Sequence, residues 1–177
     1  MNILSLDLSS KSTGWAVSVD NTLKDYGCIT ASSTDYIERL KKITAEVCDI
    51  VKKYNIKKIV CEEVRFGDKN VHTFKVLMYL QAKIVMELHD IDKEIDFEFQ
   101  QPSEWRKKVG IQTGRGVTRE ALKPADIKYV KNTYGITVND DIADAIGILD
   151  SVIKPPASKV TIQSKVAPTV IDGFEFK

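Results

Sequence analysis

Three short apolar runs at the start of the chain, followed by alternating helical and strand patterns, predict an α/β domain. Polar turns separate the first three runs, and connections this short favour an antiparallel meander. We interpret Gly14 and the pair Asp20-Asn21 as the residues that break these runs. The three strands are expected at residues 3–8, 13–19 and 23–29.

Segments of alternating type follow from Tyr36 onward. Apolar residues at helical spacing predict amphipathic helices, and shorter continuous or period-two apolar patterns predict strands. Strands are expected at 56–64 and 95–100, and helices at 36–54, 72–88, about 125–133 and 139–153. The order β-β-β-α-β-α-β-α-α predicts a mixed five-stranded sheet covered by helices.

The length of 177 residues predicts one domain. It is expected to span residues 1–154, with a loosely attached tail at 155–177 that contains Pro, Ser and Lys. The apolar runs are too short to cross a bilayer and no secretory signal is visible, which predicts residence in the cytoplasm. Three cysteines in apolar segments, Cys28, Cys48 and Cys61, are expected to be reduced core residues.

Positive charge is concentrated in residues 101–131. This segment holds eight Lys or Arg residues and three Asp or Glu residues, although the whole chain has a net charge of only +1. Such asymmetry is typical of an edge that binds a polyanion, and we expect residues 106–131 to hold a sugar-phosphate backbone. A solvated helical face beside a basic loop would give the same count, so charge alone leaves both interpretations open.

Carboxylates recur at the ends of the predicted elements. Asp7 ends the first strand, Glu62 and Glu63 end the fourth, and three aspartates begin the last helix, at positions 140, 141 and 144. Clustered carboxylates are costly to desolvate, and divalent cations compensate for that cost. The alternative for the helix is that its aspartates only cap and solubilise the first turn.

Three motifs together resemble the RuvC family of Holliday-junction resolvases, which have the ribonuclease-H-like fold. They are "LDLSSKSTGWAV", "IVCEEVRFGDKN" and "DIADAIGIL", and the resemblance covers residues 3 to about 153 in the family's order. The family's usual "DPG" is replaced here by "DLS" at residues 7–9, which suggests a divergent, phage-type member.

The resemblance implies a Mg²⁺-dependent endonuclease that leaves 5′-phosphate and 3′-hydroxyl ends, with two ions per site and Mn²⁺ as a substitute. The four acids that it assigns to the metal ions are Asp7, Glu62, Asp141 and Asp144. A different alignment would choose Glu63 in place of Glu62. Neighbouring strand residues point to opposite faces, so only one of these two is expected to bind metal.

Further roles also follow from the resemblance. Lys123 is expected to act in catalysis by stabilising charge near the scissile phosphate, and Arg115 or Arg119 could share that role. DNA contacts are expected from Phe66, Arg115, Arg119, Lys123 and Lys128, with Phe66 helping to open bases at the junction centre. As a lone aromatic residue, Phe66 could equally be a loop anchor.

The predicted helix at 72–88 is apolar on most faces. Family members use the corresponding helix to form a homodimer, so we expect one here, whereas burial within a single subunit is the alternative. His72 and His89 flank this helix without acids at ligand spacing and are expected on the surface.

Other function classes fit the sequence less well. "DLSSKSTG" could be drawn as the phosphate turn of an actin-like kinase or ATPase, but that fold needs a second lobe and about twice this length. A non-catalytic junction-binding module would be expected to lack one of the four acids. A nuclease acting on RNA–DNA hybrids or on other branched DNA would use the same acids, and it remains an alternative.

Overall fold

The computed structural model describes residues 1–65, 71–114 and 116–154, except for the side chain of Arg119. This part of the chain contains five strands and five helices. The strands are β1 (Ile3–Asp7), β2 (Ser12–Val19), β3 (Thr22–Thr30), β4 (Lys58–Glu62) and β5 (Asp96–Gln100). The helices are α1 (Tyr36–Tyr54), α2 (Val71–Ile91), α3 (Pro102–Lys108), α4 (Arg119–Tyr134) and α5 (Asp140–Ile153).

The strands form one mixed sheet in the order β3-β2-β1-β4-β5. The first three strands pair antiparallel, whereas β1 with β4 and β4 with β5 pair parallel. Parallel neighbours need a long crossover connection, which α1 and α2 supply. The mixed five-stranded sheet and its opening meander, both predicted from the sequence, are confirmed.

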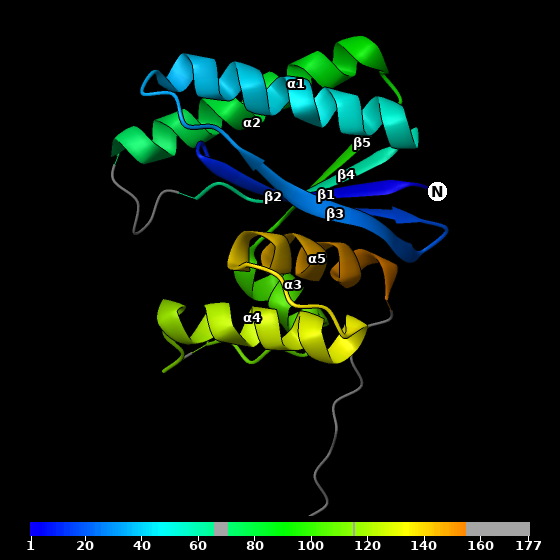
Figure 1. Cartoon of the computed structure of the whole chain (residues 1–177), viewed down its shortest axis with the longest axis vertical. Helices are drawn as coiled ribbons and strands as arrows, with labels where there is room; N and C mark the ends of the chain where they lie inside the picture. The colour runs from blue at the N-terminus through cyan, green and yellow to red at the C-terminus, as the bar shows by residue number, and fades with distance from the viewer. Residues whose placement is uncertain (66–70, 115, 155–177) are drawn as a thin grey trace, which may run out of the picture.

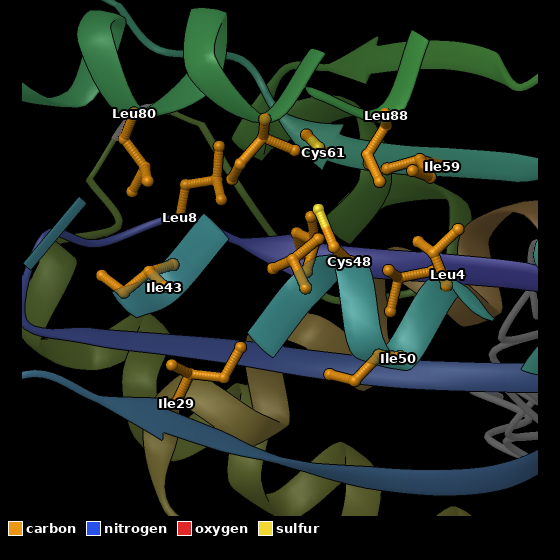
Figure 2. Packing of buried hydrophobic residues seen from close by; sticks show 14 of the residues in the cluster. Leu4, Leu8, Ile29, Ile43, Cys48, Ile50, Ile59, Cys61, Leu80 and Leu88 are labelled. Atoms are coloured by element: carbon orange, nitrogen blue, oxygen red, sulfur yellow. The ribbon is translucent and has the colours of Figure 1, made fainter. Parts of the chain in front are cut away.

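Helices cover both faces of the sheet (Figure 1). α1 and α2 lie on one face, α3 and α5 lie on the other, and α4 packs outside α5. Leu4 of β1 and Ile59 of β4 point toward α1 and α2, where they join a core completed by Leu80 and Leu88 (Figure 2). Leu6 of β1 belongs to the same core. A second core on the opposite face holds Ile3, Val60, Trp105, Ile146 and Leu149. The two cores fix the helices of both layers against the sheet.

Several element boundaries differ from the sequence prediction. Gly14 does not break a strand, because it lies inside β2 and pairs with Asp7 and Cys28. The helix predicted at about 125–133 begins at Arg119, since the helix-forming residues before Pro124 extend it by more than a turn. α3 was not predicted, although Gln101 and Glu104 form a capping box around Pro102.

The three cysteines are free thiols, as predicted. Cys48 and Cys61 are buried, and burial raises the pKa of the Cys61 thiol to about 12. The core assignment of Cys28 was wrong, because its side chain is only partly buried and its Sγ lies 3.0 Å from Ser12 Oγ. Cys28 therefore belongs to the neighbourhood of α5 and not to the core.

Among residues 1–65, 71–114 and 116–154, no helix is long and apolar enough to cross a membrane. His72 and His89 are exposed, as expected. The predicted tail at 155–177 lies outside the described residues.

Candidate functional site

β1 and β4 bring Asp7 and Glu62 to the same edge of the sheet. Leu6 pairs with Cys61 in the parallel register, so the two acids are the next residues on neighbouring strands. Side chains alternate along each strand. Because Leu6 and Cys61 belong to the core under α1 and α2, Asp7 and Glu62 face the layer that contains α3 and α5.

Glu63 lies outside this arrangement. It follows the last residue of β4 and is exposed, whereas Glu62 is half-buried. The indole nitrogen of Trp105 donates a hydrogen bond of 3.0 Å to Glu62 Oε2. Of the two glutamates, Glu62 is therefore the one that shares a face with Asp7.

α5 packs against the face of the sheet that carries these acids. Its first turn is capped by Asn139, whose side chain accepts a hydrogen bond from the Ile142 amide. Ser5 lies two residues before Asp7 on the same face of β1. Its Oγ donates a hydrogen bond of 2.7 Å to the Ala145 carbonyl. Gly14 lies so close to the Asp141 carbonyl that a Cβ at this position would be 1.9 Å from the carbonyl oxygen. Only glycine permits this approach.

The three aspartates of α5 contact different partners. Asp140 forms an ion pair with Lys123, and this hydrogen bond lowers the pKa of Asp140. Asp141 Oδ2 accepts a hydrogen bond from Ser12 Oγ, and Cys28 Sγ lies 3.9 Å from the same oxygen. The Asp144 side chain points toward α3, further into the protein interior.

The Asp144 carboxylate is strongly perturbed by its surroundings. Burial, followed by the negative charge of Asp7, raises the pKa of Asp144 to about 9. Its Oδ2 accepts a hydrogen bond of 3.2 Å from Arg106, but its buried Oδ1 has no hydrogen-bond partner. A buried carboxylate oxygen without a donor, beside a second carboxylate, is the environment that a divalent cation stabilises.

Arg106 occupies the interior of the site and not its surface. Its side chain is 8% exposed, and it contacts Asp126 through Nε and Nη2 at 2.8–3.1 Å. The same guanidinium reaches Asp144, and it interacts electrostatically with Glu62. The prediction that Arg106 belongs to an exposed, DNA-binding edge was therefore wrong, because Arg106 is buried and pairs with Asp126 and Asp144 inside the protein.

The acids do not form a closed cluster of protein ligands. In the part of the chain that the structure describes, no three His, Cys, Asp or Glu side chains are grouped so that they could hold one ion. Mg²⁺ in phosphoryl-transfer sites keeps several waters and takes only one or two carboxylates together with substrate phosphate. Open pairs of acids such as Asp7 with Asp144 suit that coordination, and the carboxylate oxygens are the hard donors that it requires.

The predicted basic residues are placed only in part. Lys123 is exposed on α4 and pairs with Asp140, which puts its ammonium group beside the start of α5. Lys128 is exposed on the same helix. Phe66 and Arg115 lie outside the described residues, and only the backbone of Arg119 is described.

Sequence reasoning missed Trp105, Arg106 and Ser12, which contact the acids, and it missed Asp126, which holds Arg106. Trp105 and Arg106 lie on α3, whose capping box was the available signal. Asp126 was counted only as a charge in the basic segment, and Ser12 only as part of a polar turn. No periodic pattern identifies such residues, because their roles arise from contacts between distant segments.

The sheet has this mixed order and is flanked by helices. Acids lie at the adjacent ends of β1 and β4 and on α5. These features define a class of α/β domains with an acidic site at the ends of the inner strands. The family model of crossover junction endodeoxyribonuclease RuvC matches residues 3–149. The RuvC protein of Ehrlichia ruminantium strain Welgevonden is 34% identical over 158 residues, covering 84% of this chain and 93% of the relative. That of Alkaliphilus oremlandii is 31% identical and covers 70% and 73%.

Solved structures agree with this fold. RuvC from Thermus thermophilus, in complex with its Holliday junction substrate, has a TM-score of 0.67 at 13% identity and covers 85% of this chain and 91% of its own. The yeast mitochondrial Holliday junction resolvase has a TM-score of 0.57 at 13% identity, with 85% and 78% covered. The chain belongs to the RuvC family, and it is a crossover junction endodeoxyribonuclease with the predicted ribonuclease-H-like fold. Membership of this family implies the use of divalent metal.

Proposed function

We propose that this nuclease cuts four-way junctions with two Mg²⁺ ions per site and leaves 5′-phosphate and 3′-hydroxyl ends. The residues that would hold the ions are Asp7, Glu62, Asp141 and Asp144. The main support for the proposal is the environment of the Asp144 carboxylate. Its buried Oδ1 has no hydrogen-bond donor, and burial and Asp7 raise its pKa to about 9. When bound, the ions supply an acidified water and neutralise the departing 3′ oxygen.

The protein's own part in this reaction is to hold the acids and to balance their charge. β1 and β4 fix Asp7 and Glu62 as adjacent residues of a rigid sheet, and Ser5 ties α5 to β1. Arg106 contacts Asp144 while Asp126 orients the guanidinium, so a positive charge already lies beside the acids. Ser12 orients Asp141. No protein nucleophile is needed, because water attacks the phosphorus.

DNA would be held by the basic residues around α4. Lys123 and Lys128 are exposed on this helix, and Arg115 and Arg119 belong to the same basic segment. Contacts from such residues to phosphates give salt-dependent affinity and read no bases directly. Recognition of the junction would therefore rest on branch shape. We keep Phe66 as the residue proposed to open bases at the junction centre.

A homodimer through α2 would allow two symmetric cuts. Val76, Leu80, Ile84 and Leu88 of this helix are buried within the subunit. Another side of α2 leaves Val71, Met78, Tyr79 and Met86 exposed, with 68% of Met86 accessible. Exposed apolar side chains concentrated on one helix are typical of an interaction surface.

The proposed reaction is tested by Mg²⁺-dependent cleavage of an end-labelled four-way junction, compared with linear duplex, a three-way branch and an RNA–DNA hybrid. Paired symmetric nicks in the four-way junction, absent in Asp7→Asn, would support the proposal. Kinase-dependent religation of the products, which reports a 5′-hydroxyl end, would contradict the proposed end chemistry. Preferred cutting of the hybrid would contradict the proposed substrate, and equal cutting of all branches would indicate a relaxed debranching nuclease of the kind expected for a phage-type member.

Lys123→Ala is expected to lower the turnover of saturating junction by about 10-fold to 100-fold, because a cation near the scissile phosphate stabilises developing charge. The metal concentration for half-maximal rate should change little. Single-turnover rates as a function of Mg²⁺ concentration measure both quantities. Lys52→Ala, which removes an exposed lysine of α1 on the opposite face of the sheet, is the control. Unchanged turnover would transfer the role to Arg115 or Arg119.

Met86→Glu is expected to weaken the dimer by about 30-fold or more, since loss of an apolar interface anchor costs about 2 kcal/mol or more. Sedimentation equilibrium measures the association, and the fraction of junctions nicked on both strands measures its consequence. Lys52→Glu changes charge on α1 and serves as the control. A wild-type dimer in Met86→Glu would argue that α2 does not form the interface.

A further inference from the structure

Trp105 is a fully buried tryptophan that has a single polar atom, and this atom points at a carboxylate of the site. Its Nε1–H donates to Glu62 Oε2 at 3.0 Å, and the residue has 0% exposure. The indole N–H is a donor only. Leaving a buried donor without an acceptor is costly, so the ring and the carboxylate hold each other in this geometry.

The ring of Trp105 has little freedom to turn away from Glu62. A Cβ on Gly147 of α5 would lie 2.5 Å from ring atom Cζ3, so the ring lies directly on the glycine backbone. The guanidinium carbon of Arg106 also lies 4.1 Å from the ring centroid, and Arg106 is itself held by Asp126. The ring therefore contacts both α5 and a cation that is itself held in place.

Glu62 has more freedom than the ring that contacts it. It is half-buried at the last position of β4, with three side-chain torsions before its oxygens. A hydrogen bond from this packed ring to one oxygen restricts those torsions and sets the direction of the other oxygen. Partners of this kind tune metal sites because they orient the ligand before the ion arrives.

We propose that Trp105 is a positioning residue that orients the Glu62 carboxylate for binding a divalent cation. The inference rests on the proposed role of Glu62 as a metal ligand. Arg106, between Trp105 and Asp144, links this orientation to the second acid, so α3 contributes to the site without a ligand of its own. Removing the donor while keeping an aromatic ring at this position should weaken metal binding more than folding.

The first test compares Mn²⁺ affinity in the full chain without DNA, measured by electron paramagnetic resonance of free Mn²⁺. Trp105→Phe is expected to bind Mn²⁺ about 10-fold more weakly, at the lower end of the range for such partners. Trp15→Phe is the matched control, because Trp15 packs on the other face of the sheet against Gly27 and lies beside Ile50 of α1. Cleavage by Trp105→Phe should approach the wild-type rate at saturating Mn²⁺.

Glu62→Gln separates the role of Trp105 from the role of Glu62. If Glu62→Gln weakens Mn²⁺ binding and Trp105→Phe does not, the positioning role is overturned and the proposed metal site stands. If Glu62→Gln binds Mn²⁺ as tightly as the wild type, the ligand role of Glu62 fails and the role of Trp105 fails with it. Weakened binding in both variants, with Trp15→Phe unchanged, supports the proposal.

A second measurement covers the case in which Trp105→Phe does not fold. In ¹⁵N-labelled wild-type protein, the indole N–H signal of Trp105 should shift when Mg²⁺ is added, and the signal of Trp15 should not. In Glu62→Gln the Mg²⁺-dependent shift of Trp105 should be lost. The inference would be overturned if the Trp105 indole signal did not shift on addition of Mg²⁺ to a wild-type protein shown to bind the ion.

Discussion

Asp144→Asn is expected to lower the rate of four-way junction cleavage by on the order of 10³-fold while leaving junction binding intact. A divalent ion contributes several kcal/mol to stabilising the transition state, and each ~1.4 kcal/mol corresponds to a tenfold change in rate. The amide keeps the shape of the side chain and can still accept the hydrogen bond from Arg106, so the fold should persist. Single-turnover cleavage and gel-shift binding in Ca²⁺ measure the two effects.

The same substitution should stabilise the metal-free protein, and this result separates an electrostatic role from a merely structural one. The pKa of Asp144 is raised to about 9 in the folded state, against an ordinary value of 3.8, by burial and by Asp7. The folded chain therefore binds a proton that the unfolded chain releases between these two pH values. Stability is lost as pH rises across that window, and Asp144→Asn removes this loss.

Thermal melts in EDTA between pH 5 and 9 measure this effect. The melting temperature of Asp144→Asn should exceed that of the wild type by a margin that grows with pH. Addition of Mg²⁺ should narrow the margin, since an ion that binds only the folded state stabilises the wild type. Asp49→Asn, an exposed aspartate of α1, is the control for both measurements. Full cleavage activity in Asp144→Asn would remove this residue from the metal site.

Gly14→Ala is expected to destabilise the fold by about 1–3 kcal/mol, because the new methyl group would overlap the backbone of α5. The added Cβ would lie 1.9 Å from the Asp141 carbonyl oxygen and 2.4 Å from its carbon. Backbone cannot rotate aside as a long side chain can, so α5 must move away from β2. Both Asp141 and Asp144 would move with it, and a misplacement of about 1 Å can cost 10²-fold in rate.

Urea unfolding and single-turnover cleavage under stabilising conditions test this expectation together. Gly27→Ala is a matched control, because its Cβ would meet the ring of Trp15 at 2.8 Å on a strand that carries no acid of the site. Both variants should be less stable than the wild type, but only Gly14→Ala should also cleave slowly when folded. Wild-type stability and rate in Gly14→Ala would mean that α5 does not approach β2 this closely.

The order of strands and helices could be predicted from the sequence because apolar residues repeat with a different period in each type of element. Leu4 and Leu6 alternate with polar or oppositely directed residues, and α1 repeats apolar residues at helical spacing. The acids at element ends were readable for the same reason, since Asp7 and Glu62 interrupt buried runs. The predicted start of α4 at about residue 125 was wrong, because the helix begins at Arg119 and includes Pro124.

The sequence by itself determined the mixed sheet, the family and the candidate acids, because these depend on local periods and on motifs in a fixed order. Only the tertiary structure decided which glutamate shares a face with Asp7, since that depends on the register between β1 and β4. The tertiary structure also shows that Arg106, which was expected to be a surface cation, is a buried partner of Asp126 and Asp144. Charge and donor groups have no period along the chain, so their roles are fixed by whichever distant groups the fold brings within contact.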